Sequence, residues 1–331
     1  MVALAPMRFI VTGGCGFIGA AVVRVLVERG DRVLNIDCRP RTARLPALAA
    51  VAGRPGYARL EADMADRALM RAVFCEFGPE RVIHLAAPAR FEPEALFNTD
   101  LAGAFSILEA CRHHLDRLAE DERDAFRIVQ AVRGPRKTTG ADIGLAPFSA
   151  ADATATAGAT LTAAWCRAHG LPLVSCHAGA VFGPWQSTDS LLSRLLASLL
   201  ACDPFELGAA GATVRDWLPV RDFARGLIAS ATAAPMSRYE FSAGAERSDA
   251  DIAAAVCTLM DDRAPRPDGA PWHDLVRLEG APPLASAPML DPSSAEADLG
   301  WTASSFHESL DRLVAWAVSS QPTSARAAVA A

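Results

Sequence analysis

The chain has 331 residues, of which 51% are hydrophobic and 21% are charged. This composition is typical of a globular protein that is large enough to form a core without disulfides or a structural metal. The formal net charge of −6 argues against binding a nucleic acid, because proteins that bind the phosphate backbone present a basic face.

Hydropathy and cysteine spacing exclude two further classes. No apolar run reaches the roughly 18 residues that span a bilayer, so we expect no membrane anchor. None of the eight cysteines belongs to a Cys-x-x-Cys pair, so neither a zinc site nor a redox dithiol is indicated. The sequence therefore predicts a cytoplasmic protein with no bound metal.

Short β-prone runs alternate with helical patterns along the first half of the chain. In chain order, the expected strands cover residues 9–11, 32–36, 57–61, 81–85, 126–132 and 172–176. The expected helices between them cover residues 21–28, 68–77, 99–115 and 157–169. Strands that alternate with helices indicate a parallel sheet covered on both faces. We therefore expect an α/β fold, with a Rossmann-type doubly wound parallel sheet.

From about residue 178 the pattern loosens into short elements separated by prolines. We expect helices at residues 190–200 and 310–318, and mostly irregular structure over the proline-rich residues 265–288.

These patterns divide the chain into two domains. Residues 7–177 are expected to form a dinucleotide-binding Rossmann domain, completed by residues 217–242. Most of residues 178–318 are expected to form a smaller, substrate-type C-terminal domain. The alanine-rich tail at residues 319–331 is expected to be disordered.

Three glycines follow the first strand and open the first helix, at Gly13, Gly16 and Gly19. Their missing side chains allow a tight turn, close approach of main-chain N–H groups to a pyrophosphate, and close packing of helix on strand. The helix N-terminus adds partial positive charge. Asp37 ends the second strand about twenty residues further on, where a carboxylate can accept hydrogen bonds from an adenosine ribose. The combination predicts a dinucleotide site.

Asp37 also influences whether NAD or NADP binds. Asp37 favours NAD over NADP, because a carboxylate repels a 2′-phosphate. Arg39 and Arg41 leave NADP open, since either could pair with that phosphate. The alternative for both arginines is an ordinary solvated surface position.

Further motifs extend this pattern along the chain. They are Asp63, His84-Leu85-Ala86-Ala87, Asn98, Gly183-Pro184, Arg215-Asp216-Trp217-Leu218 and Leu299-Gly300-Trp301. Together with the glycine loop, they resemble the extended short-chain dehydrogenase/reductases of the NAD-dependent epimerase/dehydratase family. Within that family the sequence is most similar to the dTDP-glucose 4,6-dehydratases, which have an acidic insertion like residues 113–126.

The resemblance implies two ligands and an assembly. The implied NAD contacts are Gly13, Gly16, Phe17, Ile18, Gly19, Asp37, Asp63, Met64, Ala86, Ala87 and Asn98. A sugar nucleotide is the implied substrate, with Arg215 near its phosphates, unless Arg215 forms a structural ion pair with a nearby carboxylate. The helices at residues 99–115 and 157–169 match those through which the family dimerises. We therefore expect a homodimer, or a pair with an active homologue.

The residues that the family uses for catalysis are absent from the matching positions. The resemblance implies a Tyr-x-x-x-Lys pair, in which the tyrosine transfers a proton and the lysine lowers the tyrosine's pKa. These positions hold Ala151 and Ala155. The only tyrosines, Tyr57 and Tyr239, lie in other expected strands and have no lysine four residues on.

Other implied positions in the substrate half are also changed. The family's Ser/Thr and Asp-Glu positions hold Ala131, Val132 and Arg133. Those facing the nicotinamide and the sugar hold His177, Gly179 and Ala180, and those clamping the phosphates hold Ala281 and Ala287. Because the losses fall in one functional region, the substrate half is interpreted as decayed or repurposed.

Three polar side chains remain as candidates for chemistry, and two of them have a simpler alternative. His177 follows the sixth strand, where open α/β sheets place their sites, and could act as an acid or base near neutral pH. Its alternative is a packed strand-end histidine. Lys137, the only lysine, could reach the nicotinamide ribose or could be a surface residue. Arg90 follows the His84 motif and is expected to face the substrate region.

These observations are compatible with three different functions. The first is an NAD(H)-binding homologue that lacks the hydride chemistry and acts as a regulatory or partner protein. The alternative is an active NAD-dependent sugar-nucleotide dehydratase or epimerase with relocated catalytic residues. A third, an NAD-independent scaffold, requires a vestigial glycine loop. The intact cofactor motif beside the missing catalytic pair favours the first.

Overall fold

The computed structural model of the chain describes residues 6–38, 46–88, 92–132, 150–207, 211, 213–244, 246–277 and 290–320. The chain forms two compact units. Unit 1 comprises Met1–Ala178, Phe223–Phe241 and Pro292–Trp301, and unit 2 comprises Gly179–Asp222, Ser242–Asp291 and Thr302–Ala331.

Within its described residues, unit 1 is built on a seven-stranded sheet in the order β10-β6-β5-β4-β1-β2-β3. All neighbouring strands are parallel. The strands are β1 (Arg8–Thr12), β2 (Arg32–Asp37), β3 (Tyr57–Glu61), β4 (Arg81–His84), β5 (Arg127–Ala131), β6 (Leu173–Ala178) and β10 (Arg238–Phe241). The strand order reverses between β1 and β4, which is where such sheets open a crevice for a ligand. The predicted Rossmann-type α/β fold is confirmed.

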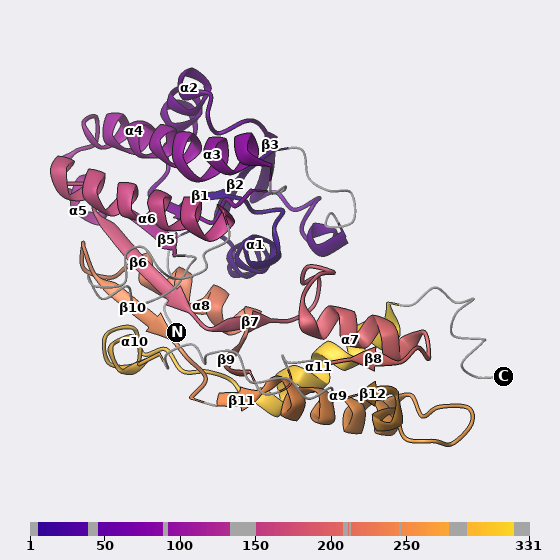
Figure 1. The fold of residues 1–331 in the computed structure, drawn as a ribbon. Coiled ribbons are helices and arrows are strands. Elements are labelled where there is room, and N and C mark those ends of the chain that lie inside the picture. Colours follow the sequence, from indigo (N-terminus) through magenta and orange to yellow (C-terminus); the bar gives the residue numbers. More distant parts are fainter. Residues whose placement is uncertain are drawn as a thin grey trace. The chain divides into compact units, whose positions relative to one another are not determined.

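Helices cover both faces of this sheet (Figure 1). The helices α2 (Arg67–Phe77), α4 (Ala104–Leu115) and α6 (Ala150–His169) share one core with residues of β1, β2, β4, β5 and β6. On the opposite face, α1 (Phe17–Arg29) places Arg29 over the ring of Phe9, and α8 (Val220–Ser230) places the Ser230 hydroxyl 3.3 Å from the Cys176 thiol. Shorter helices are α3 (Pro93–Phe97), α5 (Glu120–Ala125) and α10 (Ser293–Leu299).

The helix expected at residues 99–115 is not one continuous α-helix. It begins with a π-helical segment, η2 (Asn98–Gly103), and continues as α4. Buried Asp100 lies in this segment, and its carbonyl packs so closely on α6 that a Cβ added to Gly158 would lie 2.3 Å from the carbonyl oxygen. π-helical turns of this kind are frequent at functional sites.

The helix expected at residues 157–169 begins seven residues earlier than predicted, at Ala150. Alanine favours the helical backbone, and threonine can bond an earlier carbonyl inside a helix. Thr156 donates to the Asp152 carbonyl in this way, at 2.8 Å. The extra turns bring Thr154 to Asp100, which is a contact that sequence periodicity does not reveal.

Unit 2 contains a three-stranded sheet in the order β11-β9-β7, from β7 (Ala180–Phe182), β9 (Val214–Pro219) and β11 (Glu246–Ser248). A two-stranded sheet pairs β8 (Phe205–Glu206) with β12 (Val276–Arg277). The helices are α7 (Leu191–Leu200), α9 (Asp249–Arg263), η4 (Trp272–Leu275) and α11 (Phe306–Ser319). Their core is apolar, with Trp272, Leu195, Leu199 and Leu310 fully buried.

The last helix begins four residues before the predicted Leu310, because the Ser305 hydroxyl accepts the Glu308 N–H and caps the helix at Phe306. It ends at Ser319, and residues 321–331 of the expected disordered tail lie outside the described residues. None of the described helices has the length and apolarity that a membrane crossing requires.

Candidate functional site

The glycine loop between β1 and α1 has a conformation that requires glycine. Gly13 has φ +71°, and a Cβ there would lie 2.7 Å from the Ala86 Cα. Its N–H donates to the Ile36 carbonyl at 2.9 Å. The loop is therefore held between the end of β2 and the segment after β4, at the reversal point of the sheet.

The first turn of α1 can receive an anion. The first N–H groups of a helix have no acceptor within the helix. Gly16 is the N-cap of α1 and offers no side-chain hydrogen bond to them. At Gly19 a Cβ would lie 2.2 Å from the Gly13 carbonyl oxygen, so the helix can approach the loop only because this residue has no side chain. Both features fit a pyrophosphate.

Asp37 is attached directly to this loop. Its carboxylate accepts the Cys15 N–H at 2.8 Å. Burial, followed by the charge of Asp37, raises the pKa of the Cys15 thiol. Burial and then Asp37 also raise the pKa of Cys38, with a smaller effect of the same sign from Asp63. The edge of the site where a ribose would lie therefore carries two carboxylates.

One cation at this edge was missed in the sequence. Against the larger effects of burial and Asp37, the Arg59 guanidinium on β3 acts to lower the pKa of the Cys15 thiol, although only Arg39 and Arg41 were expected as partners for a 2′-phosphate. Those two arginines lie outside the described residues. Arg59 was missed because its strand neighbour in β2 is Asn35, and this pairing cannot be read from the sequence.

The remaining predicted cofactor residues fall into exposed and buried groups. Asp63, Ala87 and Asn98 are exposed, whereas Ala86 lies against Gly13. Met64 is only 8% exposed and belongs to the core beneath α4. Its side chain approaches Gly103, where a Cβ would lie 3.5 Å from the Met64 Cβ.

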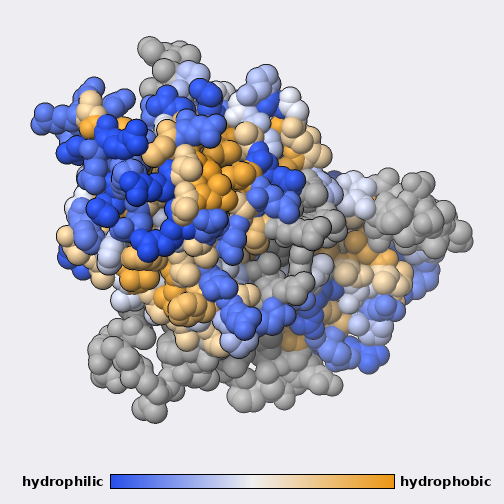
Figure 2. Space-filling view, turned by 90° about the horizontal axis from the view of Figure 1, so that it is seen from above, coloured by the Kyte–Doolittle hydropathy of each residue, from blue (hydrophilic) through white to orange (hydrophobic). Residues whose placement is uncertain are grey.

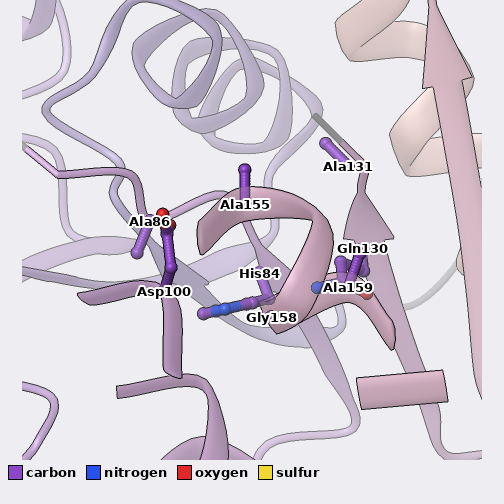
Figure 3. Close-up of a pocket in the computed structure, with 8 residues that line it drawn as sticks. All are labelled: His84, Ala86, Asp100, Gln130, Ala131, Ala155, Gly158 and Ala159. Carbon is purple, nitrogen blue, oxygen red and sulfur yellow. The ribbon is translucent and has the colours of Figure 1, made fainter. Parts of the chain in front are cut away.

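A small cavity lies where the family's catalytic residues were expected (Figure 3). It encloses about 20 Å³, which is room for one water molecule. Ala131 at the end of β5 and Ala155 on α6 both line it. The structure thus brings together the two positions at which the family's Ser/Thr and lysine were expected, and each side chain is a methyl group.

Three polar side chains also line this cavity, and each lies within hydrogen-bonding distance of a threonine hydroxyl. Asp100, 6% exposed, accepts a 2.8 Å hydrogen bond from the Thr154 hydroxyl. His84, 8% exposed, has its Nδ1 2.7 Å from the Thr12 hydroxyl. The Gln130 amide donates to Thr162 at 3.3 Å. His84 and Gln130 are direct neighbours across β4 and β5.

Asp100 is the functional candidate that sequence reasoning missed. It was overlooked in favour of Asn98, two residues earlier, which is exposed. The signal was present, because Leu96, Asp100, Gly103 and Ile107 follow the 3–4-residue spacing of one buried helix face. A carboxylate on such a face needs a partner or a function.

Neither tyrosine of the chain lies at this cavity. The Tyr57 hydroxyl accepts a hydrogen bond from the Asn35 amide at 3.1 Å. The Tyr239 hydroxyl donates to Asp298 at 3.2 Å. Burial is the main cause of a raised pKa for both phenols, and neither residue lines the cavity.

His177 is the one of the three remaining candidates that the structure describes, and it does not line this cavity. His177 lies in β6 opposite Glu240 of β10 and is partly exposed. Lys137 and Arg90 lie outside the described residues, and so do Arg133, Ala281 and Ala287.

In unit 2, Arg215 forms the ion pair that was the alternative to a substrate contact. Its guanidinium donates two hydrogen bonds to Asp249, at 2.8 and 3.0 Å. The Asp249 side chain is only 1% exposed, so it depends on this partner. Gly179 packs on β9, where a Cβ would lie 2.1 Å from the Asp216 carbonyl oxygen.

Comparison with known proteins identifies the family. A family model described as "NAD dependent epimerase/dehydratase family" matches residues 9–240. The chain belongs to this family. Among the described residues of this family member, no group of three or more histidine, cysteine or acidic side chains is placed to hold a metal.

Its relatives include several dehydratases. The dTDP-glucose 4,6-dehydratase of Neisseria gonorrhoeae is 29% identical, over 93% of this chain and 95% of its own. That of Escherichia coli is 27% identical, over 94% and 93%. The crystal structure of the dTDP-glucose 4,6-dehydratase from Streptomyces venezuelae, with NAD bound, has a TM-score of 0.75 at 25% identity, covering 95% of this chain and 98% of that one.

Proposed function

We propose that this family member binds NAD(H), cannot carry out the tyrosine–lysine hydride chemistry, and acts as a regulatory or partner protein. The observation that carries the proposal is the contrast between neighbouring regions of one sheet. The glycine loop has the backbone and the carboxylate that a dinucleotide needs. The cavity nearby presents Ala131 and Ala155 where acid–base groups were expected.

The proposal that the protein binds NAD(H) rests on how well the residues of the glycine loop and Asp37 fit a dinucleotide. Gly13, Gly16 and Gly19 would hold the pyrophosphate, and Asp37 would accept the ribose hydroxyls. The carboxylates of Asp37 and Asp63 favour NAD over NADP, because a 2′-phosphate would add negative charge beside them. Relatives crystallised with NAD, such as the Streptomyces venezuelae enzyme, support this choice. When bound, the nicotinamide ring supplies hydride transfer.

The proposal that the protein lacks the hydride chemistry rests on the inability of alanine to transfer a proton. A methyl group can neither accept nor donate a proton, and it cannot lower the pKa of a neighbouring phenol. The two tyrosines are hydrogen-bonded to Asn35 and Asp298. No described residue therefore reproduces the pair.

One observation favours the alternative, an active sugar-nucleotide dehydratase or epimerase with relocated residues. Asp100 and His84 line one cavity at the carboxyl ends of the strands, and a carboxylate beside an imidazole is a common acid–base pair. Under this alternative, a sugar nucleotide is the substrate, and Asp100 joins His177, Lys137 and Arg90 as candidates.

The proposal includes a homodimer, or a pair with an active homologue, formed through α4 and α6. Ala157, Thr160 and Ala164 are exposed on α6 at i, i+3 and i+7, so one face of small residues would allow close packing. Phe105 and Trp165 are partly exposed and stack edge to face 4.9 Å apart. Figure 2, which views the molecule from above relative to Figure 1, shows hydrophobic residues among hydrophilic ones on that face. A cytoplasmic location is part of the same proposal.

The first test is calorimetric titration of cofactor-stripped protein with NAD⁺, NADH and NADPH. We expect micromolar binding of NAD⁺ and NADH, about −8 kcal/mol, and weaker binding of NADPH. No binding by any of the three would leave the glycine loop vestigial and reject both the partner and the enzyme functions.

The second test separates the proposal from its alternative. The purified protein is incubated with dTDP-glucose and NAD⁺, and the Neisseria gonorrhoeae dehydratase is assayed in parallel as the control. We expect no turnover. If turnover is found, Asp100→Asn and His177→Ala identify which side chain carries it.

A further inference from the structure

Unit 1 has a larger cavity at the opposite end of its sheet from the glycine loop. It lies where β5, β6 and β10 begin, and Arg123 and Asp124 of α5 also line it, whereas the glycine loop follows the end of β1. Its volume of about 610 Å³ falls within the range of roughly 300–1,000 Å³ that holds small-molecule ligands.

The floor of this cavity is apolar. Leu115 from the end of α4, Cys166 from α6, and Leu171 with Pro172 before β6 line it, and all four are buried. Met236 stands at the rim with 45% of its surface exposed. An apolar ligand body would cover this surface and remove it from water.

The backbone at the rim is also unusual. Met236 has φ +63°, a region that residues other than glycine rarely adopt. Its N–H donates to the Leu173 carbonyl at 2.6 Å, and this bond ties the turn before β10 to the start of β6. Strained backbone of this kind clusters at sites that bind ligands.

Three arginines surround the apolar floor, against a single carboxylate. They are Arg123, Arg127 and Arg167, and the acid is Asp124. Arg167 forms no hydrogen bond or ion pair with any residue that the structure describes. The lining therefore has an excess of positive charge that a ligand anion would balance.

Arg127 is already oriented for such an anion. Its Nε donates to the Ala233 carbonyl at 2.6 Å, and its Nη1 donates to the carbonyls of Asp124 and Phe126 at 2.6 and 2.7 Å. The two Nη2 hydrogens have no acceptor among the described residues. Burial lowers the pKa of Arg127, so its charge would gain from an anionic partner. A guanidinium fixed in this way loses little entropy when it binds.

We propose that this cavity binds a small organic anion, in which one carboxylate, sulfonate or phosphate group is attached to an apolar body. The apolar part would lie on Leu115, Leu171 and Met236. The anionic group would lie between Arg127 and Arg167. The site does not depend on the proposed function, because it shares no residue with the glycine loop or the smaller cavity.

The test uses two probes that differ only in charge. 8-Anilinonaphthalene-1-sulfonate is an apolar anion whose fluorescence rises when it leaves water, and N-phenyl-1-naphthylamine is the same molecule without the sulfonate. Each is titrated into the wild type, Arg167→Gln and Arg71→Gln, with NAD⁺ present in excess. Arg71 is an exposed arginine of α2 in the same unit and does not line the cavity, so it controls for the lost charge.

We expect saturable binding of the sulfonate that Arg167→Gln weakens about tenfold, which is the loss of one charge-assisted hydrogen bond. Binding of the uncharged probe should be unchanged by Arg167→Gln, and Arg71→Gln should leave both probes unaffected. The proposal is overturned if the wild type does not bind the sulfonate saturably, if NAD⁺ displaces it, or if the two variants behave alike.

Discussion

Replacing Gly13 by alanine tests the proposed cofactor site most directly, because the structure assigns two separable costs to the added methyl group. The first cost is conformational. At φ +71° an alanine pays about 1–2 kcal/mol to keep the left-handed backbone. Gly170 has nearly the same conformation, φ +65°, with no atom within 4 Å of its would-be Cβ. Gly170→Ala therefore measures this cost alone.

The second cost is steric and concerns the ligand. The Cβ at Gly13 would lie 2.7 Å from the Ala86 Cα, where ordinary contact begins at 3.4 Å. Because both atoms belong to backbone segments, the loop must move by the difference, 3.4 − 2.7 = 0.7 Å. Binding constellations tolerate only about 0.5 Å of displacement. Losing two hydrogen bonds to the charged pyrophosphate costs about 3 kcal/mol or more, which is at least a hundredfold in affinity.

The assay is calorimetric titration with NAD⁺, together with thermal unfolding of the three proteins. We expect Gly170→Ala to lower the unfolding free energy by about 1–2 kcal/mol and to bind NAD⁺ like the wild type. Gly13→Ala should unfold at least as easily and lose NAD⁺ binding. A Gly13→Ala protein that binds NAD⁺ within threefold of the wild type would refute the reasoning.

Three further predictions concern buried polar groups. Arg215→Ala should reduce the free energy of unfolding by about 3 kcal/mol, because it leaves buried Asp249 unpaired. In thermal unfolding, the double variant Arg215→Ala/Asp249→Ala should recover part of this loss. No recovery would contradict the role of the ion pair. Thr154→Val should cost about 2 kcal/mol in denaturant unfolding, since buried Asp100 loses a donor, and a neutral effect would argue against that bond. Burial lowers the pKa of His114 in the folded state. The free energy of unfolding that this residue contributes should therefore be lost as pH falls through the unfolded-state pKa of about 6.5. Below the folded-state pKa no further loss should follow, and His114→Gln should unfold with a flatter pH dependence between about 5 and 7. An unchanged slope would contradict this assignment.

Local patterns in the sequence predicted most of the sheet and the glycine loop between β1 and α1. The glycine motif depends on neighbours along the chain, and its strand-turn-helix context was visible at Gly13–Gly19. Most expected strands of unit 1 match the structure to within a residue or two. Parallel sheets of this kind have buried strands with strong apolar runs, which makes them easy to recognise.

The rest depended on contacts between distant segments. Asp100 meets Thr154, which lies 54 residues away, and no local signal in the sequence predicts this contact. Arg215 is paired with Asp249, 34 residues on. The sequence left both a phosphate contact and an ion pair open for Arg215, because the partner could be identified only from the register of β9 and β11.

The make-up of unit 1 from three separate chain segments has a consequence for synthesis. The edge strand β10 pairs with β6 but follows it by about sixty residues, and Tyr239 of β10 is bonded to Asp298 of a still later segment. Until residue 241 has left the ribosome, the apolar strand β6 has an unpaired edge, which is a template for aggregation. We therefore expect a chain truncated after Ala178 to be recovered mainly as aggregate, although it contains the whole glycine loop.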